Sequence, residues 1–535
     1  MENSNNNKNK SRWIATTASI WIQALIGGAY TFSIYSPALK KSQSYDQFTL
    51  NTVSVFKDIG TNAGVLSGLL YSAASSRRHR SGVPWVVHAV GATEGFLGYF
   101  LIWLAVVGVI PKPPVPVMCV FMFLAAHSQT FFNTWNVVTS VQNFPDYSGT
   151  LVGLMKGFLG LSGAILIQIF KVFFSGNPST YILMLALLPS IVSLSLMSMV
   201  RLCPEKGPDD KKHLNAMSIV SMLLAAYLMI ILIMEDVFVF PQWARLLVFV
   251  LLLLFLSLPL KIANEAKLKE KSQPLLIKSD QLPFSFDSNQ PDEKVLDEDQ
   301  NNELICEEVN MNLLEAMKNV NFWLLFIAIL CGMGSGLATI NNMSQLGQSY
   351  GYDTTRVNTL VSLWSIWNFF GRFGAGYISD TLLRQKGWAR PLVMAIALGA
   401  MTIGHIIIGA GFIGNLYIGT ILVGICYGAL WSLMPTIASE IFGVLHMGTI
   451  YNAIAIGNPL GTYVLSVWVI GHIYDEEAAQ EGHNSCIGVR CFMISFFVMA
   501  FVSFLGFLVA LALFFRTRVF YRFVVLRRLH FSLRK

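Results

Sequence analysis

The chain has 535 residues, of which 54% are hydrophobic and only 13% are charged, and its formal net charge is +7. Soluble globular proteins carry about a quarter charged residues, so this composition excludes an ordinary soluble protein and indicates a polytopic membrane protein. The basic residues are spread over short loops and the C-terminal tail, which is typical of membrane topology and argues against nucleic-acid binding.

Apolar stretches of about 20 residues, the length that crosses the hydrocarbon core, recur along the chain, and about fourteen meet this criterion. They predict an all-α membrane fold with two six-helix bundles and two extra helices. The first bundle (13–200) has spans at 13–39, 48–75, 83–110, 115–141, 150–174 and 181–200. The inserted helices (201–261) are 216–234 and 243–260. The second bundle (320–516) has spans at 321–345, 357–379, 391–412, 416–441, 448–472 and 491–515.

Basic residues fall in alternate loops, as they should if this count is right. With residues 1–12 as a cytosolic tail, both termini are predicted to be cytosolic, and residues 517–535 form a basic tail. Residues 262–319 are polar and poor in aromatics, which predicts a disordered cytosolic loop whose role is open. Within it, Glu270 followed by Leu275 and Leu276 resembles an acidic dileucine sorting signal, so the plasma membrane and the vacuolar membrane are the alternatives for location.

Motifs for enzymatic chemistry are missing from the sequence. There is no Walker phosphate loop, no H-E-x-x-H and no G-x-S-x-G, so we expect neither a pump driven by ATP nor a hydrolase. The seven cysteines have no CxxC spacing, and we expect no metal site and no cofactor. Cys486 and Cys491 lie on the predicted outer side, where a disulfide and two free thiols are both open alternatives.

Two short echoes, separated by roughly 300 residues, indicate an internal repeat. Asn51-Thr52 opens the second span as Asn358-Thr359 opens the tenth, and Gly149-Thr150 opens the fifth as Gly448-Thr449 opens the thirteenth. The halves are therefore spans one to six and nine to fourteen, with spans seven and eight inserted between them.

The end of the tenth span resembles the loop signature of the major facilitator superfamily. Gly376 and Asp380 have the spacing G-x-x-x-D, and Arg384 and Lys386 follow as the trailing basic residues. The resemblance implies two bundles that work by alternating access, with these four residues as a gating motif. In the first-half copy, Gly68 is followed by Ser72 where the family has aspartate, so that side should latch differently or not at all.

Longer runs are similar to the plant nodulin-like branch of this superfamily, which includes the nuclear-fusion-defective group. They are residues 21–40, FKDIGTNAGVLSGLL (56–70) and NFPDYSGTLVGLMKGFLGLSGAI (143–165). A more distant similarity is to monocarboxylate carriers, which place an arginine where Arg372 stands. The matching arginine implies that the solute is charged. Asn368 replaces the aspartate of these carriers, so a proton-coupling role of that aspartate is not implied for this chain.

Charged residues inside the spans are costly, so they need a partner or a watery cavity and suggest a transport pathway. Glu94, near the middle of the third span, is a candidate proton carrier or a carboxyl bonded to a neighbouring helix. Lys57 and Asp58 are consecutive, so only one of them is expected to face the pathway. Lys156 either faces the pathway or reaches the interface. Arg372 either grips a carboxylate or braces Asp380.

Neutral polar and aromatic residues complete the candidate pathway. Such residues hydrogen-bond between helices as often as they contact a solute. The candidates are Tyr30 in the first span, Asn133 in the fourth and Asn341 and Gln345 in the ninth.

The sequence thus predicts a secondary active transporter of a small polar or anionic organic solute, with proton coupling through Glu94 or Asp58 left open. We expect a monomer in the lipid bilayer, with no nucleic-acid partner. The alternative from a different class is a receptor or scaffold that kept the carrier fold and signals through the cytosolic loop.

Overall fold

The computed structural model describes residues 11–45, 47–76, 85–174, 178–203, 210–238, 240–272, 310–352, 354–412, 414–480 and 486–525. This part of the chain consists of helices and short connections, without a strand. The prediction of an all-α fold agrees with it. Arg77, Arg78 and Arg80, Leu275 and Leu276, and most of the predicted cytosolic loop lie outside the described residues.

The described residues of the first half form eight α-helices, because its first two spans are each divided. They are α2 (Arg12–Gln23), α3 (Phe32–Gln43), α4 (Gln47–Asn62), α5 (Val65–Ser76), α6 (Trp85–Val107), α7 (Val115–Asn143), α8 (Ser148–Phe173) and α9 (Pro178–Leu196). The 3-10 turns η1 (Gly28–Thr31) and η2 (Pro145–Tyr147) precede α3 and α8. Helices α6 and α7 pack along each other, and α4 packs on α7.

The inserted pair is α10 (Asp210–Val237) and α11 (Gln242–Ser272). α11 continues well past the predicted end of its span, so residues 262–272, which were predicted to belong to the loop, are helical. The pair packs on α2 and α8, and α10 also contacts α17 of the second half. Arg12 of α2 and Asp210 of α10 form an ion pair with a shortest distance of 2.5 Å.

The second half begins with a short helix that precedes the ninth span. Its elements are α14 (Leu313–Lys318), α15 (Val320–Asn341), α16 (Met343–Ser349), α17 (Thr354–Lys386), α18 (Arg390–Ala410), α19 (Asn415–Phe442), α20 (Met447–Ala455), α21 (Gly457–Thr462), the π-helical turn η3 (Tyr463–Gly471), α22 (His472–Gln480), α23 (Arg490–Phe520) and η4 (Tyr521–Val525). A disulfide joins Cys486, which precedes α23, to Cys491 in the first turn of α23, and this decides between the two alternatives of the sequence.

Eleven helical segments of the described chain are long and apolar enough to cross a membrane. The remaining three predicted spans correspond to α2 with α3, to α4 with α5, and to α17. The first two are interrupted near their middle, and α17 carries Arg372, Asp380 and Arg384 within its length. The count of fourteen therefore stays a prediction.

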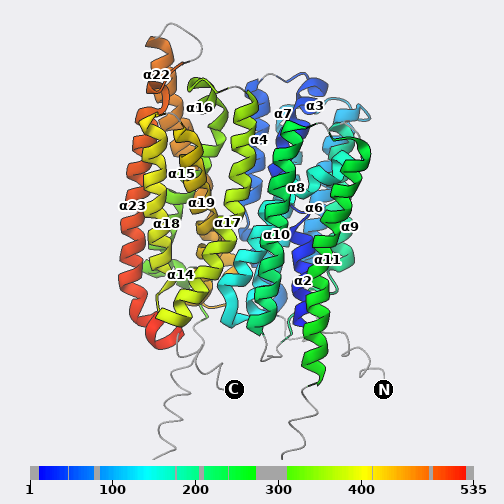
Figure 1. The fold of residues 1–535 in the computed structure, drawn as a ribbon, viewed down its shortest axis with the longest axis vertical. Coiled ribbons are helices and arrows are strands. Elements are labelled where there is room, and N and C mark those ends of the chain that lie inside the picture. Colours follow the sequence, from blue (N-terminus) through cyan, green and yellow to red (C-terminus); the bar gives the residue numbers. More distant parts are fainter. Residues whose placement is uncertain are drawn as a thin grey trace, which may run out of the picture.

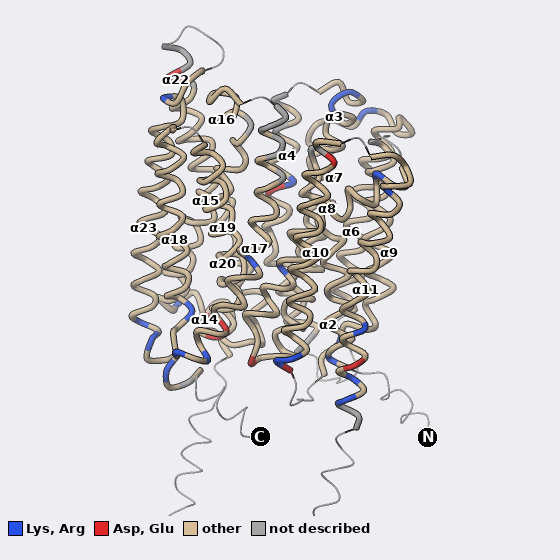
Figure 2. Tube along the Cα trace, in the orientation of Figure 1, with Lys and Arg blue, Asp and Glu red and all other residues tan. Residues whose placement is uncertain are grey.

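The two halves stand side by side with their helices roughly parallel (Figure 1). They meet mainly where α8 packs on α17 and where α5 packs on α20. α2 begins and α23 ends at the same end of the molecule, where Lys and Arg also gather (Figures 1 and 2). We call it the latch end, after the contacts described below.

Candidate functional site

A cavity of about 310 Å³ lies between the halves and receives side chains from both. Eight of the ten solute or coupling candidates line it, from η1, α4, α7, α8, α15 and α17: Tyr30, Lys57, Asp58, Asn133, Lys156, Asn341, Asn368 and Arg372. Tyr427 and Trp431 of α19 and Asn458 of α21 complete the wall on the side of the second half. Residues of distant spans thus converge on one polar space.

Lys57 and Asp58 neutralise each other at this cavity. The Nζ of Lys57 lies 2.8 Å from Oδ1 of Asp58, and the Lys57 ammonium also lies 5.5 Å from the ring centre of Phe32. Although neighbours on a helix diverge by about 100°, both residues line the cavity, because the long lysine side chain bends back toward the aspartate. The expectation that only one of them faces the cavity was wrong.

Two further cations flank one indole ring at the centre of the cavity. The Nζ of Lys156 lies 4.9 Å from the ring centre of Trp431, and Cζ of Arg372 lies 5.6 Å from it. Lys156 is 1% exposed, so it does not reach the membrane interface. Among the described residues, no ion pair engages Lys156 or Arg372. Two buried basic side chains, one from each half, thus lie beside one indole ring, and within the described structure neither is paired with a carboxylate.

Arg372 is held by polar groups of both halves. Its Nε donates to Oδ1 of Asn368 at 2.8 Å, one turn earlier on α17, and its Nη1 donates to the Lys156 carbonyl at 2.9 Å across the interface. Asp380 has other partners, so the alternative that Arg372 braces it does not apply. The neutral amide of Asn368 thus orients the guanidinium.

Several buried polar atoms around the cavity have no hydrogen-bond partner within the described structure. They are Oε1 of Gln129, Nε1 of Trp431 and Oδ1 of Asn458. Buried polar atoms are normally satisfied, and unsatisfied ones at a cavity wall are available to a solute or to water. These three atoms therefore add one donor and two acceptors to the cations and other polar groups of the cavity.

Glu94 and Gln345 lie outside this cavity. Oε2 of Glu94, on α6, is 2.9 Å from Nδ1 of His127 on α7. Gln345, on α16, is exposed. Depth in the membrane could be read from the sequence, but the direction in which a side chain leaves its helix could not.

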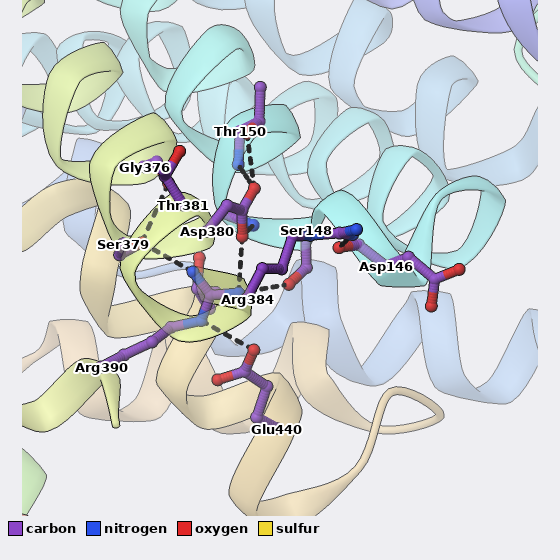
Figure 3. A network of polar contacts seen from close by, with 12 residues as sticks. Asp146, Ser148, Thr150, Gly376, Ser379, Asp380, Thr381, Arg384, Arg390 and Glu440 are labelled. Carbon is purple, nitrogen blue, oxygen red and sulfur yellow. Dashed lines mark hydrogen bonds and ion pairs between the residues drawn. The ribbon is translucent and has the colours of Figure 1, made fainter. Parts of the chain in front are cut away.

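The predicted gating motif lies at the latch end, where α17 crosses the beginning of α8 (Figure 3). The carboxylate of Asp380 accepts from the backbone N–H groups of Gly149 and Thr150 at 3.1 and 2.6 Å, and from the Thr150 hydroxyl at 2.5 Å. These N–H groups belong to the first turn of α8, where they have no partner within the helix and where the helix dipole favours a negative charge. Asp380 thus joins the two halves.

Arg390 extends this contact into an ion-pair chain. Its Nη2 lies 2.6 Å from Oδ1 of Asp380, and its Nε lies 2.7 Å from Oε1 of Glu440 on α19. The hydroxyl of Tyr521 donates to Glu440 at 2.8 Å. Since Arg390 is 2% exposed, the chain is sheltered from water and its charges depend on one another.

The other three residues of the gating motif, Gly376, Arg384 and Lys386, differ in their contacts. Arg384 donates to the Asp146 carbonyl, and its Cζ lies 3.8 Å from the ring centre of Tyr147. Gly376 is needed for close approach, because a Cβ there would lie 2.2 Å from the Gly149 carbonyl oxygen. Lys386 is exposed and stays in its own half, 5.3 Å from the ring centre of Trp388. We call Asp380, Arg384, Arg390 and their partners on η2 and α8 the ionic latch.

The first-half copy of the motif makes the second crossing, where α5 meets the beginning of α20. A Cβ on Gly68 would lie 2.4 Å from Cα of Thr449, so the helices touch there through backbone. The Ser72 hydroxyl is 3.3 Å from the Thr449 hydroxyl. The repeat thus pairs Gly68 and Ser72 with Gly448-Thr449, as it pairs Gly376 and Asp380 with Gly149-Thr150. We call this crossing the neutral latch.

Sequence reasoning missed several of these residues. Arg390 and Glu440 were not singled out as site residues, although an acid so close to the end of an apolar span, as Glu440 is, is a signal in itself. Trp431 gave no such signal, since its importance depends on which helix faces it.

Comparisons with known proteins cover almost the whole chain. The model of the family Nodulin-like matches residues 12–264, and that of NFD4, C-terminal domain, matches residues 303–523. Protein NUCLEAR FUSION DEFECTIVE 4 of Arabidopsis thaliana is 27% identical, with 95% of this chain and 89% of that protein covered. Probable transporter MCH1 of Candida glabrata is 25% identical over 33% of this chain and 39% of that one. The solved structure of the major facilitator superfamily proton:xylose symporter XylE aligns with a TM-score of 0.54 and 13% identity, over 93% and 94% of the two chains.

Proposed function

Because the chain belongs to the nodulin-like family, with an NFD4-type C-terminal domain on a major facilitator fold, we propose that it carries a small anionic organic solute by alternating access. It is a membrane transporter of this superfamily rather than an enzyme. The carried solute, its coupling and the topology are the parts that we propose.

The observation that carries the proposal is the pair of cations at Trp431. Burial of a charge inside a membrane protein costs several kcal/mol unless an opposite charge or water compensates it. Lys156 and Arg372 lie on opposite halves and lack a carboxylate in the described structure, while Lys57 and Asp58 cancel each other. An anionic solute would supply the missing charge and would contact both halves at once.

The proposed topology has fourteen spans and cytosolic termini, with the latch end in the cytosol. The disulfide of Cys486 and Cys491 supports it, because disulfides belong to oxidising compartments and this one is near α22, at the end opposite the latches (Figure 1). The location in the plasma membrane or the vacuolar membrane stays part of the proposal.

Uptake into proteoliposomes tests the anion. We would supply labelled short-chain mono- and dicarboxylates and compare the wild type with Lys156→Met and Arg372→Gln. Each change removes one charge-assisted contact, so we expect uptake at low solute concentration to fall by about tenfold or more. Lys261→Met is the matched control, since this cation is exposed on α11, away from the cavity.

Two results would contradict the proposal. One is uptake of neutral sugars in preference to every carboxylate. The other is carboxylate uptake that survives both cavity substitutions and the double substitution without change.

A further inference from the structure

The pair Glu94 and His127 lies at the break in the second span. The break separates α4 from α5 at Ala63 and Gly64. The Nε2 of His127 is 3.0 Å from the Ala63 carbonyl, and its Nδ1 is 2.9 Å from the Glu94 carboxyl. His127 therefore bridges a carboxyl on α6 and a backbone group that has left the regular helix.

We propose that Glu94 and His127 bind one proton between them and that this proton holds the break in the second span to α7. The proton site does not depend on the proposed transport function. Only the effect of this proton on transport rests on that function. The site itself is separate from the anion cavity, because neither residue lines that cavity.

Counting hydrogens gives the reason. The Ala63 carbonyl can only accept a hydrogen bond, so Nε2 of His127 must carry a hydrogen. The Nδ1 contact then holds a second hydrogen, either on an imidazolium beside a carboxylate or on a carboxylic acid beside a neutral imidazole. With one proton fewer, a single ring N–H faces two acceptors. Either the Glu94 contact or the Ala63 contact is then lost.

The break is also where the second span touches the opposite half. The Nδ2 of Asn458 donates to Oδ1 of Asn62 at 3.2 Å, and a Cβ on Gly64 would lie 2.2 Å from Oδ1 of Asn452. The opposing span is itself divided, between α20 and α21. A change at Ala63 therefore acts on a segment that helps to close the halves against each other at the neutral latch.

Other titratable groups on the helices around the pair have contacts elsewhere. On α4, Lys57 pairs with Asp58 at 2.8 Å. On α5, Tyr71 donates to Gln142. On α6, His88 is 2.8 Å from the Ser193 hydroxyl, and Tyr99 packs on Tyr35, while Cys119 lies two turns before His127 on α7.

The two partners differ in exposure. The Glu94 side chain is 23% exposed, whereas that of His127 is 3% exposed. A proton that enters or leaves the pair would therefore do so through the carboxyl, while the imidazole passes the effect to the backbone. The protonated pair favours the conformation described here, and loss of the proton favours release of the break.

Hydrogen exchange measured by mass spectrometry tests the site without any solute. The purified chain in nanodiscs would be followed from about pH 5 to 8, the range in which histidine pairs commonly titrate. Exchange in residues 59–68, corrected for the intrinsic pH dependence, would be compared with that of α8, which is continuous. We expect it to become about tenfold faster as the pH rises, since that factor matches the loss of one hydrogen bond.

Three variants make the test specific. Glu94→Gln keeps a neutral hydrogen-bonding group beside His127 and should leave exchange slow at every pH. His127→Asn removes the bridge and should leave it fast at every pH. Glu235→Gln is the control. Glu235 lies on the inserted helix α10 and pairs with Lys171 of α8, so this variant should keep the wild-type profile.

A flat wild-type profile, or a Glu94→Gln profile that follows the wild type, would overturn the proton site. Failure of the anion proposal looks different. If the exchange profile behaves as expected but no carboxylate is taken up, the proton site stands and the solute assignment falls. If carboxylates are taken up but exchange does not depend on pH, the reverse holds.

Discussion

The ionic latch and the neutral latch are two solutions to the same crossing. In each, a glycine of one half lets a helix rest on the first turn of a helix from the other half. At the ionic latch, Asp380 and Arg390 continue the contact to Glu440, whereas at the neutral latch Ser72 meets Thr449 through hydroxyls. The comparison teaches that backbone approach is common to both crossings, whereas among the described residues only the ionic latch carries charged side chains.

The helices differ in the same way. The ionic latch joins α8 and α17, which are both continuous, and the neutral latch joins α5 and α20, which both belong to divided spans. A buried ion-pair chain tolerates little displacement, while hydroxyl contacts beside a helix break can rearrange at low cost. We therefore expect the rigid crossing to set the geometry of closure and the divided one to move first.

The largest effect should come from Asp380→Asn. The change leaves Arg390 with an uncompensated charge and weakens the contact with α8, which for a buried ion pair costs about 3–5 kcal/mol. We expect the latch end to open, and a longer distance between spin labels at Leu202 and Gln385, which are exposed on the two halves.

Asp210→Asn is the matched control for this prediction. Asp210 pairs with Arg12 at the same end of the molecule, but this pair does not join the two halves. Its loss should lower the thermal stability and leave the label distance unchanged. An unchanged distance in Asp380→Asn would mean that the ionic latch does not hold the halves together.

A smaller effect, equal at the two latches, is expected from Gly376→Ala and Gly68→Ala. The added methyl would meet backbone atoms at 2.2 and 2.4 Å, which cannot move away as a flexible side chain can. Overpacking of this kind costs about 1–3 kcal/mol. The loss of stability is measured by thermal unfolding of the two variants. Gly399→Ala, where the added methyl has more space, is the control. Clearly unequal losses of stability at Gly376 and Gly68 would contradict the claim that both latches depend on close backbone contact.

The smallest effect should come from Ser72→Asp, which gives the neutral latch the acid it lacks. A carboxylate at the first turn of α20 gains at most about 1 kcal/mol from the helix terminus, since no counterpart of Arg390 is described there. The label distance should shift slightly toward the closed state. A gain as large as the loss in Asp380→Asn would show that the acid alone, without its ion-pair chain, makes a latch.

The sequence predicted the fold well because its signals are local. Apolar length gave the span positions, and the echoes at Gly149-Thr150 and Gly448-Thr449 gave the halves whose first turns later proved to be the latch sites. It also singled out Lys156 and Arg372, because cations inside spans have few structural uses, and both line the cavity between the halves. Their place on a transport pathway stays a prediction.

What the sequence could not give depends on contacts between distant spans. The break at Ala63 has no proline to announce it, and it is fixed by Asn458 and His127 from elsewhere in the chain. Glu94 had the right depth for a cavity residue, but its direction around α6 was not readable. The pairing of Asp380 with Arg390, rather than Arg372, likewise needed the fold.

The inserted helices make the lipid surroundings of the two latches unequal. α10 packs against both α8 and α17, and Tyr377 of α17 donates to Asn215 of α10 at 3.2 Å, so protein covers this seam. α10 and α11 do not pack extensively on α5 or α20. Bilayer thickness and lipid headgroups should therefore act on the carrier through one seam only, and a change of membrane composition should favour movement at the neutral latch before it disturbs the ionic one.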